Sequence, residues 1–444
     1  MLERFFGHIL RRTMLTVTHT EAELGADLLE DDDMQEAPGN LTTDIRRTGK
    51  HEALTWDLIQ MVEHDRQLKR LLECAIHQAA EQNPDRQTNP VYSLESYYAF
   101  VDRSIQALPW AISPAEEYSA LYDRIDQSMG CFYFICNQPL EELAGKGYYH
   151  NSLMYHEPFR SWMVKLTSAY GAFLSTEDSW CEEYYLNALA DQSFRLGEDL
   201  YEDPSNWKTF NDFFARRLKD PSKRPIDEPG NDRVIVSPAD AVPQGLWQID
   251  ENGRVSAGGA AVKTGTLTDI AVLLGDSKYA HAFAGGTMTH TLLDVNDYHR
   301  YHFPAGGTVR EVSVIPGDDA PGGVIVWDRA AGRYKEYGSE EIGWQCIETR
   351  GAVILELPKG GLAAIVPVGM CQVSSVNFEK TVMPGAAVRK GDPLGYFLFG
   401  GSDIIMIFDR AAGFTLGAEP GRHLEMGRTY GYLKTNENIE EERG

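Results

Sequence analysis

The sequence predicts an α+β protein with a helical N-terminal region and a β-rich C-terminal region. Apolar residues in 51–82 recur at steps of three and four, which is typical of amphipathic helices. Past about residue 232, short β-rich runs such as GTVREVSVIPG and GAVILELP are separated by Gly and Pro, as in a sheet of short strands. The length of 444 residues is enough for two or three domains.

The elements follow in order along the chain. Residues 1–45 include the acidic stretch LLEDDDMQEAPGN and are expected to be a flexible segment. Residues 46–204 are expected to form a helical domain, and residues 205–444 a β-rich domain. Beyond the first amphipathic stretch, further helices are expected at 93–108, 115–128, 158–174 and 179–199.

Charge and cysteine content narrow the class of protein. The formal net charge of −25 argues against a nucleic-acid partner and against docking on an anionic membrane. The apolar run in ERFFGHILRR is too short to span a bilayer and resembles no secretory signal. The six cysteines form no CxxC pair, so we expect reduced thiols in a cytoplasmic protein. No HExxH or zinc-spaced Cys/His cluster occurs, and no metal is predicted.

The stretch GYFLFGGSDIIMIF, residues 395–408, places Gly400, Gly401 and Ser402 between two apolar runs. By itself this pattern is typical of a hairpin turn. Asp240 in VSPAD, together with a histidine and Ser402, would instead supply the parts of an activated nucleophile. The esterase motif G-x-S-x-G is absent, which disfavours a conventional α/β-hydrolase.

The histidines that could complete such a site are His299 and His302 in DYHRYHF. Three residues apart, they would share one face of a helical turn but point to opposite faces of a strand. Asp240 after Ser-Pro-Ala has a plainer interpretation as a turn or cap residue.

Five ordered blocks carry a family resemblance. They are TFNDFFARRLKDPSKRPID (209–227), VSPAD (236–240), DYHRYHFPAGG (297–307), VGMCQVSSVNF (368–378) and KGDPLGYFLFGGS (390–402). From about residue 205 to 430 the chain resembles the phosphatidylserine decarboxylase family. The helical N-terminal half is similar to the extension of its soluble members, among them fungal tryptophan decarboxylases. The resemblance implies a phosphatidylserine decarboxylase-like catalytic domain.

The resemblance also implies self-cleavage between Gly401 and Ser402. Ser402 would attack the Gly401 carbonyl, and elimination and hydrolysis would leave a pyruvoyl group at the new N-terminus. The products would be a large chain, 1–401, and a small chain, 402–444. Asp240 with His302 would activate the Ser402 hydroxyl. The pyruvoyl group would form a Schiff base with the substrate amine, without metal or pyridoxal phosphate, and His299 would reprotonate the α-carbon.

By analogy, Ser374 and Ser375 are expected to bind the substrate carboxylate, and Phe303 to line the site. Serines at strand ends and aromatic residues in a core are also common for structural reasons. Phe213, Phe214, Arg216 and Arg217 are interpreted as structural.

Two residues depart from the family pattern. Ala241 follows the aspartate where Gly is usual, and Asp403 follows the cleavage serine where Thr or Ser is common. Asp403 is predicted either to disfavour an anionic head group or to pair with a cationic part of the substrate. Its alternative is a side chain that points to solvent.

We therefore expect a pyruvoyl-dependent decarboxylase, a carboxy-lyase, acting on a soluble and plausibly aromatic, tryptophan-like amino acid. The alternative substrate is phosphatidylserine, with phosphatidylethanolamine as product. Three other functions stay open: a relative unable to cleave itself because of Asp403, a serine hydrolase, and a carrier-like binding module. In the last case Lys380 lacks the expected flanking residues. A homo-oligomer is compatible with the sequence.

Overall fold

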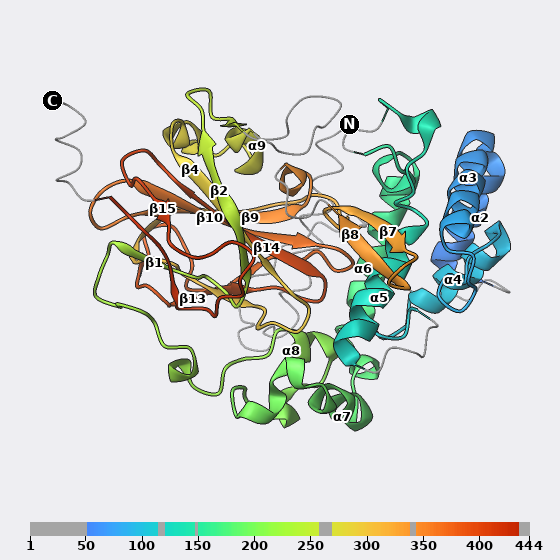
Figure 1. The fold of residues 1–444 in the computed structure, drawn as a ribbon, viewed down its shortest axis with the longest axis horizontal. Helices are drawn as coiled ribbons and strands as arrows, with labels where there is room; N and C mark the ends of the chain where they lie inside the picture. The colour runs from blue at the N-terminus through green and yellow to red at the C-terminus, as the bar shows by residue number, and fades with distance from the viewer. Residues whose placement is uncertain (1–50, 114–119, 147–149, 257–268, 338–342, 435–444) are drawn as a thin grey trace, which may run out of the picture.

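The structure is a computed structural model that describes residues 51–113, 120–146, 150–256, 269–337 and 343–434. Helices occupy the N-terminal part and strands most of the C-terminal part, so the predicted α+β class is confirmed (Figure 1). The segment expected to be flexible, 1–45, lies outside the described residues.

The helices begin and end at recognisable sequence signals. The Asp65 carboxylate caps α3 by accepting hydrogen bonds from the backbone N–H groups of Gln67 and Leu68. The helix expected over 179–199 ends at Ala190, because Asp191 is extended and its carboxylate accepts the Ser193 N–H at the start of the next turn. The α-helices are α2 (Ala53–His64), α3 (Arg66–Gln82), α4 (Leu94–Ser104), α5 (Leu121–Phe134), α6 (Phe159–Phe173), α7 (Glu182–Ala190), α8 (Phe210–Phe214) and α9 (Ile270–Leu273).

An eight-stranded sheet dominates the C-terminal part, in the order β12-β6-β9-β10-β14-β4-β2-β3. Smaller sheets are β1-β16-β15, β11-β13-β5 and the hairpin β7-β8. The strands are β1 (Val234–Val236), β2 (Val242–Ile249), β3 (Val255–Ser256), β4 (Thr287–Leu293), β5 (Arg300–His302), β6 (Gly307–Ile315), β7 (Val324–Asp328), β8 (Arg333–Tyr337), β9 (Thr349–Glu356), β10 (Leu362–Met370), β11 (Asn377–Phe378), β12 (Ala387–Val388), β13 (Pro393–Tyr396), β14 (Gly401–Phe408), β15 (Thr415–Leu416) and β16 (Thr429–Tyr432).

Strands β10 and β14 form the centre of the large sheet and are buried over almost their whole length. They run antiparallel, with Gly369 opposite Ser402 and Met370 opposite Gly401. On its other side β14 pairs with β4, which places Leu293 opposite Ser402. The continuous apolar run of residues 404–408 is typical of a strand covered on both faces. The strand that begins at the Gly-Gly-Ser motif therefore lies in the core.

The β7–β8 hairpin joins the helical part to the β-rich part (Figure 1). The backbone N–H of Tyr334 donates to Gln127 Oε1 on α5 at 2.6 Å, and Gln127 Nε2 donates to the Tyr334 carbonyl at 3.1 Å. The Ile325 N–H donates to Asn137 Oδ1 at 2.7 Å. Gly130 on α5 is required here, because a Cβ would lie 2.5 Å from the Cβ of Tyr334. Buried polar contacts thus fix the two regions against each other.

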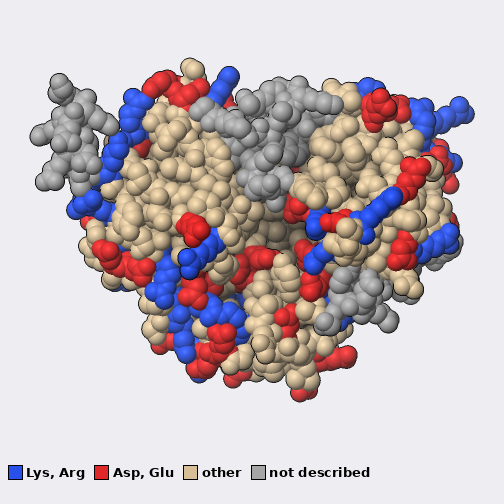
Figure 2. All heavy atoms as spheres, in the orientation of Figure 1, with Lys and Arg blue, Asp and Glu red and all other residues tan. Residues whose placement is uncertain are grey.

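The surface carries both signs of charge. Figure 2 shows Lys and Arg side chains interspersed with Asp and Glu over the face drawn. Within the described ranges, no helix has the length and apolar character needed to cross a bilayer.

Candidate active site

Gly400 and Gly401 connect two different sheets, so the interpretation as a hairpin turn is wrong. β13 belongs to the sheet β11-β13-β5, whereas β14 is a central strand of the eight-stranded sheet. Gly400 has a φ of 145°, which side chains rarely tolerate, and a Cβ there would lie 2.5 Å from the Met370 carbonyl oxygen. The double glycine therefore lets the chain cross between sheets in close contact with the end of β10.

Ser402 is the second residue of β14 and is 1% exposed. Its Oγ has no hydrogen-bond partner among the residues that the structure describes. Buried hydroxyl groups in folded proteins are normally hydrogen-bonded, because an unpaired one costs about 1–3 kcal/mol. An unpaired buried hydroxyl directly after the glycine crossover is consistent with a reactive rather than a structural serine.

The side chain of Asp403 is not exposed, so the alternative in which it points to solvent is wrong. The residue is completely buried, and its carboxylate lies 3.0 Å from His290 Nδ1 and 3.1 Å from Gln345 Nε2. Trp247 stacks on the His290 ring at a centroid distance of 5.1 Å. Successive side chains of a strand point to opposite faces, so Asp403 lies on the other side of β14 from Ser402. The predicted contact between Asp403 and the substrate is not supported by this geometry.

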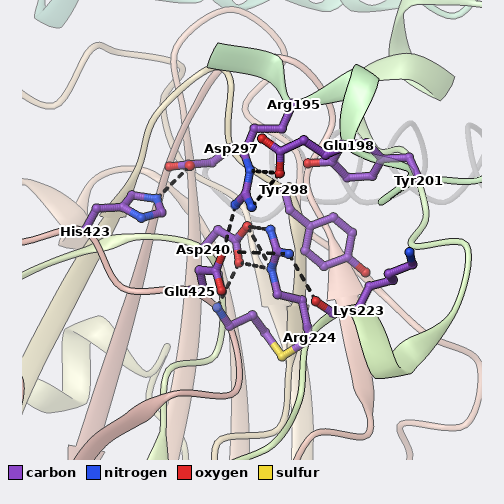
Figure 3. Close-up of polar contacts among 12 residues, drawn as sticks. Arg195, Glu198, Tyr201, Lys223, Arg224, Asp240, Asp297, Tyr298, His423 and Glu425 are labelled. Carbon is purple, nitrogen blue, oxygen red and sulfur yellow. Dashed lines mark hydrogen bonds and ion pairs between the residues drawn. The ribbon is translucent and has the colours of Figure 1, made fainter. Parts of the chain in front are cut away.

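Asp240 lies just before β2 and is held by a buried arginine (Figure 3). Arg224 Nε donates to both carboxylate oxygens at 2.9 and 3.2 Å, and Arg224 Nη2 adds a further hydrogen bond. The backbone N–H of Met426 donates to Asp240 Oδ1 at 2.8 Å. Both side chains of the ion pair are almost fully buried. Paired and hydrogen-bonded in this way, the Asp240 carboxylate is fixed in one orientation.

The C-terminal segment 423–426 lies beside the Asp240 carboxylate. Ala241 and Leu424 exchange two backbone hydrogen bonds. Glu425 accepts a hydrogen bond from Arg195 Nη1 at 2.7 Å and lies 3.9 Å from Arg224 Nη1 (Figure 3). The proposed small chain therefore contributes directly to the surroundings of Asp240.

His302 ends β5 and is engaged at both ring nitrogens. Its Nδ1 lies 3.0 Å from the Gly391 carbonyl oxygen, and its Nε2 lies 3.2 Å from the Tyr298 hydroxyl. Burial lowers the pKa of His302, and the negative charge of Asp240 opposes that shift only in part. The charge of Asp240 therefore affects the pKa of His302, although no hydrogen bond between the two side chains is found in the described part of the chain.

His299 lies just before β5 and turns away from His302. Its Nδ1 lies 3.0 Å from the Asp297 carbonyl oxygen, while its Nε2 is buried without a partner among the described residues. Phe214 on α8 covers the ring at a centroid distance of 3.8 Å. Burial, with a smaller effect from the positive charge of Arg216, lowers the pKa of His299 to about 3. The ring is therefore neutral at physiological pH.

The predicted catalytic residues share one region but do not form a hydrogen-bonded triad in this state. Within the described ranges, no hydrogen bond joins Asp240, His302 and Ser402. His299 is connected instead to residues 397–401, the segment before the predicted cleavage site, which we call the cleavage loop. Its carbonyl accepts the Phe397 N–H at 2.9 Å, and Phe214 contacts both the His299 ring and the Phe399 ring.

The residues predicted to bind substrate have structural contacts. Ser374 Oγ donates to the Gly369 carbonyl at 2.7 Å. Ser375 Oγ accepts the Leu398 N–H at 2.9 Å. Phe303 is a buried core residue. The prediction that both serines bind a carboxylate is therefore not supported, because their hydroxyl groups hold the backbone around the cleavage loop.

Three buried carboxyl groups near the end of β10 were not anticipated. Burial raises the pKa of Asp318 to about 8 and that of Asp319 to about 7, and it raises the pKa of Glu348 strongly. The backbone joins this cluster to the cleavage loop, since the Cys371 N–H donates to the Ala320 carbonyl at 2.8 Å. Helix α6 contacts it through an Arg160–Asp318 ion pair and a Thr167–Asp319 hydrogen bond. The helical region therefore borders the site.

No role was predicted for Arg224 and Phe399 from the sequence, and Phe214 was interpreted only as structural. All three lie inside the blocks that carried the family resemblance, so their position in those blocks was the available signal. No group of three or more His, Cys, Asp or Glu side chains in the described part of the chain is arranged to hold a metal ion.

Comparison with known proteins places this site in a family. A family profile described as phosphatidylserine decarboxylase matches residues 210–432. A phosphatidylserine decarboxylase proenzyme from Anaeromyxobacter sp. is 33% identical, covering 55% of this chain and 86% of its own length. A second such proenzyme, from Oryza sativa, is 31% identical over 51% of this chain but only 33% of its own length.

A third relative differs in name and extent. Decarboxylase iboD from Amanita muscaria is 27% identical, covering 66% of this chain and 87% of its own length. The profile matches the part of the chain that contains the glycine crossover, Ser402 and both histidines. The chain therefore belongs to the phosphatidylserine decarboxylase family and is a decarboxylase, that is, a carboxy-lyase.

Proposed function

We propose that the chain is a proenzyme that cleaves itself between Gly401 and Ser402 and then decarboxylates a free, aromatic amino acid. The observation that carries this proposal is the buried Ser402 hydroxyl, which is without a partner among the described residues and follows a glycine crossover. A serine that was only structural would be expected to satisfy its hydroxyl, as Ser374 and Ser375 do.

The residues present fit a pyruvoyl group at position 402. Such a group supplies an electrophilic carbonyl that takes the substrate amine and accepts electrons as carbon dioxide leaves. Residue 402 would be the first residue of the small chain after cleavage. Its strand pairing with Gly369 and Leu293 would hold it in place. Gly369 allows the backbone of residues 374–375 to pack directly against the strand, because a Cβ there would lie 2.8 Å from the Ser374 backbone.

His299 is the residue best placed to move a proton. Its Nδ1 is bound by the Asp297 carbonyl, so its Nε2 carries the lone pair. As a neutral ring it accepts a proton first and can then return it to the α-carbon. A bound substrate carboxylate would raise the pKa of the ring and favour that uptake. Activation of Ser402 by Asp240 and His302 stays a prediction, for which His302 would have to exchange its contact with Tyr298.

Two observations favour a free aromatic amino acid as substrate. Aromatic rings surround the His299 side of the cleavage loop, where Phe399 contacts Tyr170 of α6 and Phe210 and Phe214 of α8. Flat aromatic surfaces suit an aromatic side chain. The relative named decarboxylase iboD is also similar over a larger share of this chain than the proenzyme relatives. Phosphatidylserine is the alternative, supported by the names of those relatives.

Intact-mass spectrometry of the purified chain and of Ser402→Ala tests the cleavage. We expect two chains, ending at Gly401 and beginning with a blocked pyruvoyl terminus, in the wild type only. A folded wild-type chain that stays at 49.7 kDa would refute the proposal.

Carbon dioxide release then separates the substrates. We expect release with tryptophan or another free aromatic amino acid and little with phosphatidylserine liposomes. The reverse pattern would assign the phospholipid instead. The Ser402→Ala variant serves as the blank for both substrates.

A further inference from the structure

Arg216 is a buried cation without a counter-ion. The residue follows α8, and its exposed fraction is 0%. In the part of the chain that the structure describes, no carboxylate lies within ion-pair distance of its guanidinium, and its Nε has no hydrogen-bond partner. Burying an unpaired charge is costly, so such an arrangement is expected where the charge has a function.

Arg224 provides the contrast eight residues further along. It is equally buried, but Asp240 neutralises it through a bidentate ion pair. The fold is therefore able to supply a carboxylate to a buried arginine in this region. Arg216 lacks one, and so its role is not that of an ion-pair partner.

The Arg216 guanidinium binds backbone carbonyl groups instead. Its Nη2 donates to the carbonyl oxygens of Asn296 at 2.7 Å and Asp297 at 2.8 Å. The aromatic ring of Tyr201 lies 4.5 Å from its central carbon, which helps to fix the plane of the group. Arg216 thus holds the turn that leads into His299.

The same carbonyl determines the state of His299. The Asp297 oxygen accepts from Arg216 and also lies 3.0 Å from His299 Nδ1. A carbonyl oxygen only accepts, so Nδ1 carries the proton and Nε2 carries the lone pair. The Asp297 carboxylate is engaged separately, by His423 Nε2 at 2.8 Å (Figure 3).

Arg216 is the charged side chain that affects the pKa of His299. It lies just after α8, and its charge lowers that pKa in addition to the larger effect of burial. The Asp297 carboxylate on the same turn is engaged by His423 of the C-terminal segment, and Asp240 is engaged by Arg224. Phe214 of α8 covers the ring with an uncharged face. The positive charge of Arg216 therefore acts on a ring whose negatively charged neighbours are already paired.

We propose that Arg216 is a positioning residue: it fixes the 296–299 turn, holds the Nδ1 proton of His299 on the Asp297 carbonyl so that Nε2 carries the lone pair for proton transfer, and adds its positive charge to burial in keeping the ring neutral. This inference rests on the proposed role of His299 in the decarboxylation. It assigns a function to a residue that the sequence pattern alone suggests is structural.

The pH dependence of decarboxylation tests the proposal in the cleaved enzyme. Arg216→Gln removes the charge, so the limb of the pH–rate profile that depends on His299 should move up by about one pH unit. Arg216→Lys keeps the charge but loses the planar guanidinium that lies over Tyr201 and binds the two carbonyl groups, so the rate should fall while the limb stays in place. Arg217→Gln is the matched control, because it removes the same charge from the exposed neighbouring position. A profile of Arg216→Gln that coincides with that of Arg217→Gln would overturn the proposal.

A second measurement does not depend on activity. In the uncleaved Ser402→Ala chain, ¹⁵N chemical shifts of labelled histidine report which ring nitrogen of His299 carries the proton. We expect the Nδ1–H form, with a titration midpoint that rises when Arg216→Gln is added. A proton on Nε2 would overturn the proposal even if the variants fold poorly. If the wild type releases no carbon dioxide while His299 behaves as expected, the proposed function fails and the positioning role stands.

Discussion

The first residues of β14 differ in hydrogen bonding between the two faces of the strand. On one face the Ser402 hydroxyl is buried and unpaired among the described residues. On the other face Asp403 is equally buried, yet its carboxylate is bound by His290 and Gln345. The Asp403 carboxylate is therefore hydrogen-bonded, whereas the neighbouring Ser402 hydroxyl has no partner among the described residues. Such a difference between adjacent residues is expected if the Asp403 face is structural and the Ser402 face has the chemical role that we propose.

The largest effect is expected from Gly400→Ala, which disturbs the Ser402 face. The new Cβ would lie 2.5 Å from the Met370 carbonyl oxygen at a φ of 145°. Because displacement by about 1 Å can cost roughly 100-fold in rate, we expect cleavage to slow by about that factor. The rate is measured by intact mass over time.

Gly385→Ala is the matched control for Gly400→Ala. Gly385 also has a positive φ, of 90°, but a Cβ there meets nothing within 4 Å. We expect this variant to lose some stability and to cleave at the wild-type rate. Equal cleavage by Gly400→Ala and the wild type would contradict the assignment of the crossover.

The next effect concerns the Asp403 face. Asp403→Ala removes one partner of a buried pair, which typically lowers the free energy of unfolding by about 3–5 kcal/mol. Urea denaturation in the Ser402→Ala background measures this in a single chain. Asp403→Asn keeps the size and part of the hydrogen bonding, so its loss should be smaller. A loss below about 1 kcal/mol for Asp403→Ala would mean that the pair is not structural.

A third prediction concerns pH and the acid cluster behind the same loop. Burial raises the folded-state pKa of Asp319 to about 7, far above the ordinary value of 3.8, whereas Asp318 is paired with Arg160. The folded chain therefore holds a proton on Asp319 that the unfolded chain releases. Stability from this source is complete below about pH 4 and is lost as pH rises through about 7. Denaturation of the Ser402→Ala chain from pH 5 to 8.5 measures the slope.

Asp319→Asn should flatten that slope, because the amide does not titrate. Asp57→Asn, at an exposed position on α2, removes a carboxylate without burial and should leave the slope unchanged. An Asp319→Asn chain as pH-dependent as the wild type would contradict this role for the cluster.

The smallest effect is expected from Ser375→Ala. Its hydroxyl accepts the Leu398 N–H, so its removal should cost about 1 kcal/mol of stability. The KM for the amino acid should stay within about twofold, because the hydroxyl is already occupied by the backbone. A large rise in KM at unchanged stability would restore the original prediction that Ser375 binds the substrate.

Much of the architecture could be predicted from the sequence by itself. Hydrophobic periodicity identified the helical and β-rich regions, and ordered motifs identified the family and led to the prediction of a cleavage site. These features depend on local spacing and on motif order, both of which a linear pattern records. The early end of α7 was not predictable, because it depends on the extended conformation of Asp191, which caps the next turn and whose residue type does not require that conformation.

Only the tertiary structure decided which polar groups are satisfied. The sequence suggested that Ser374, Ser375 and Asp403 meet a substrate, but their partners are backbone groups or buried side chains far away in the chain. It likewise could not distinguish Arg216 from Arg224, two buried arginines of which only one has a carboxylate. Hydrogen bonds and ion pairs form between residues brought together by folding, whereas residue type records only the capacity to form them.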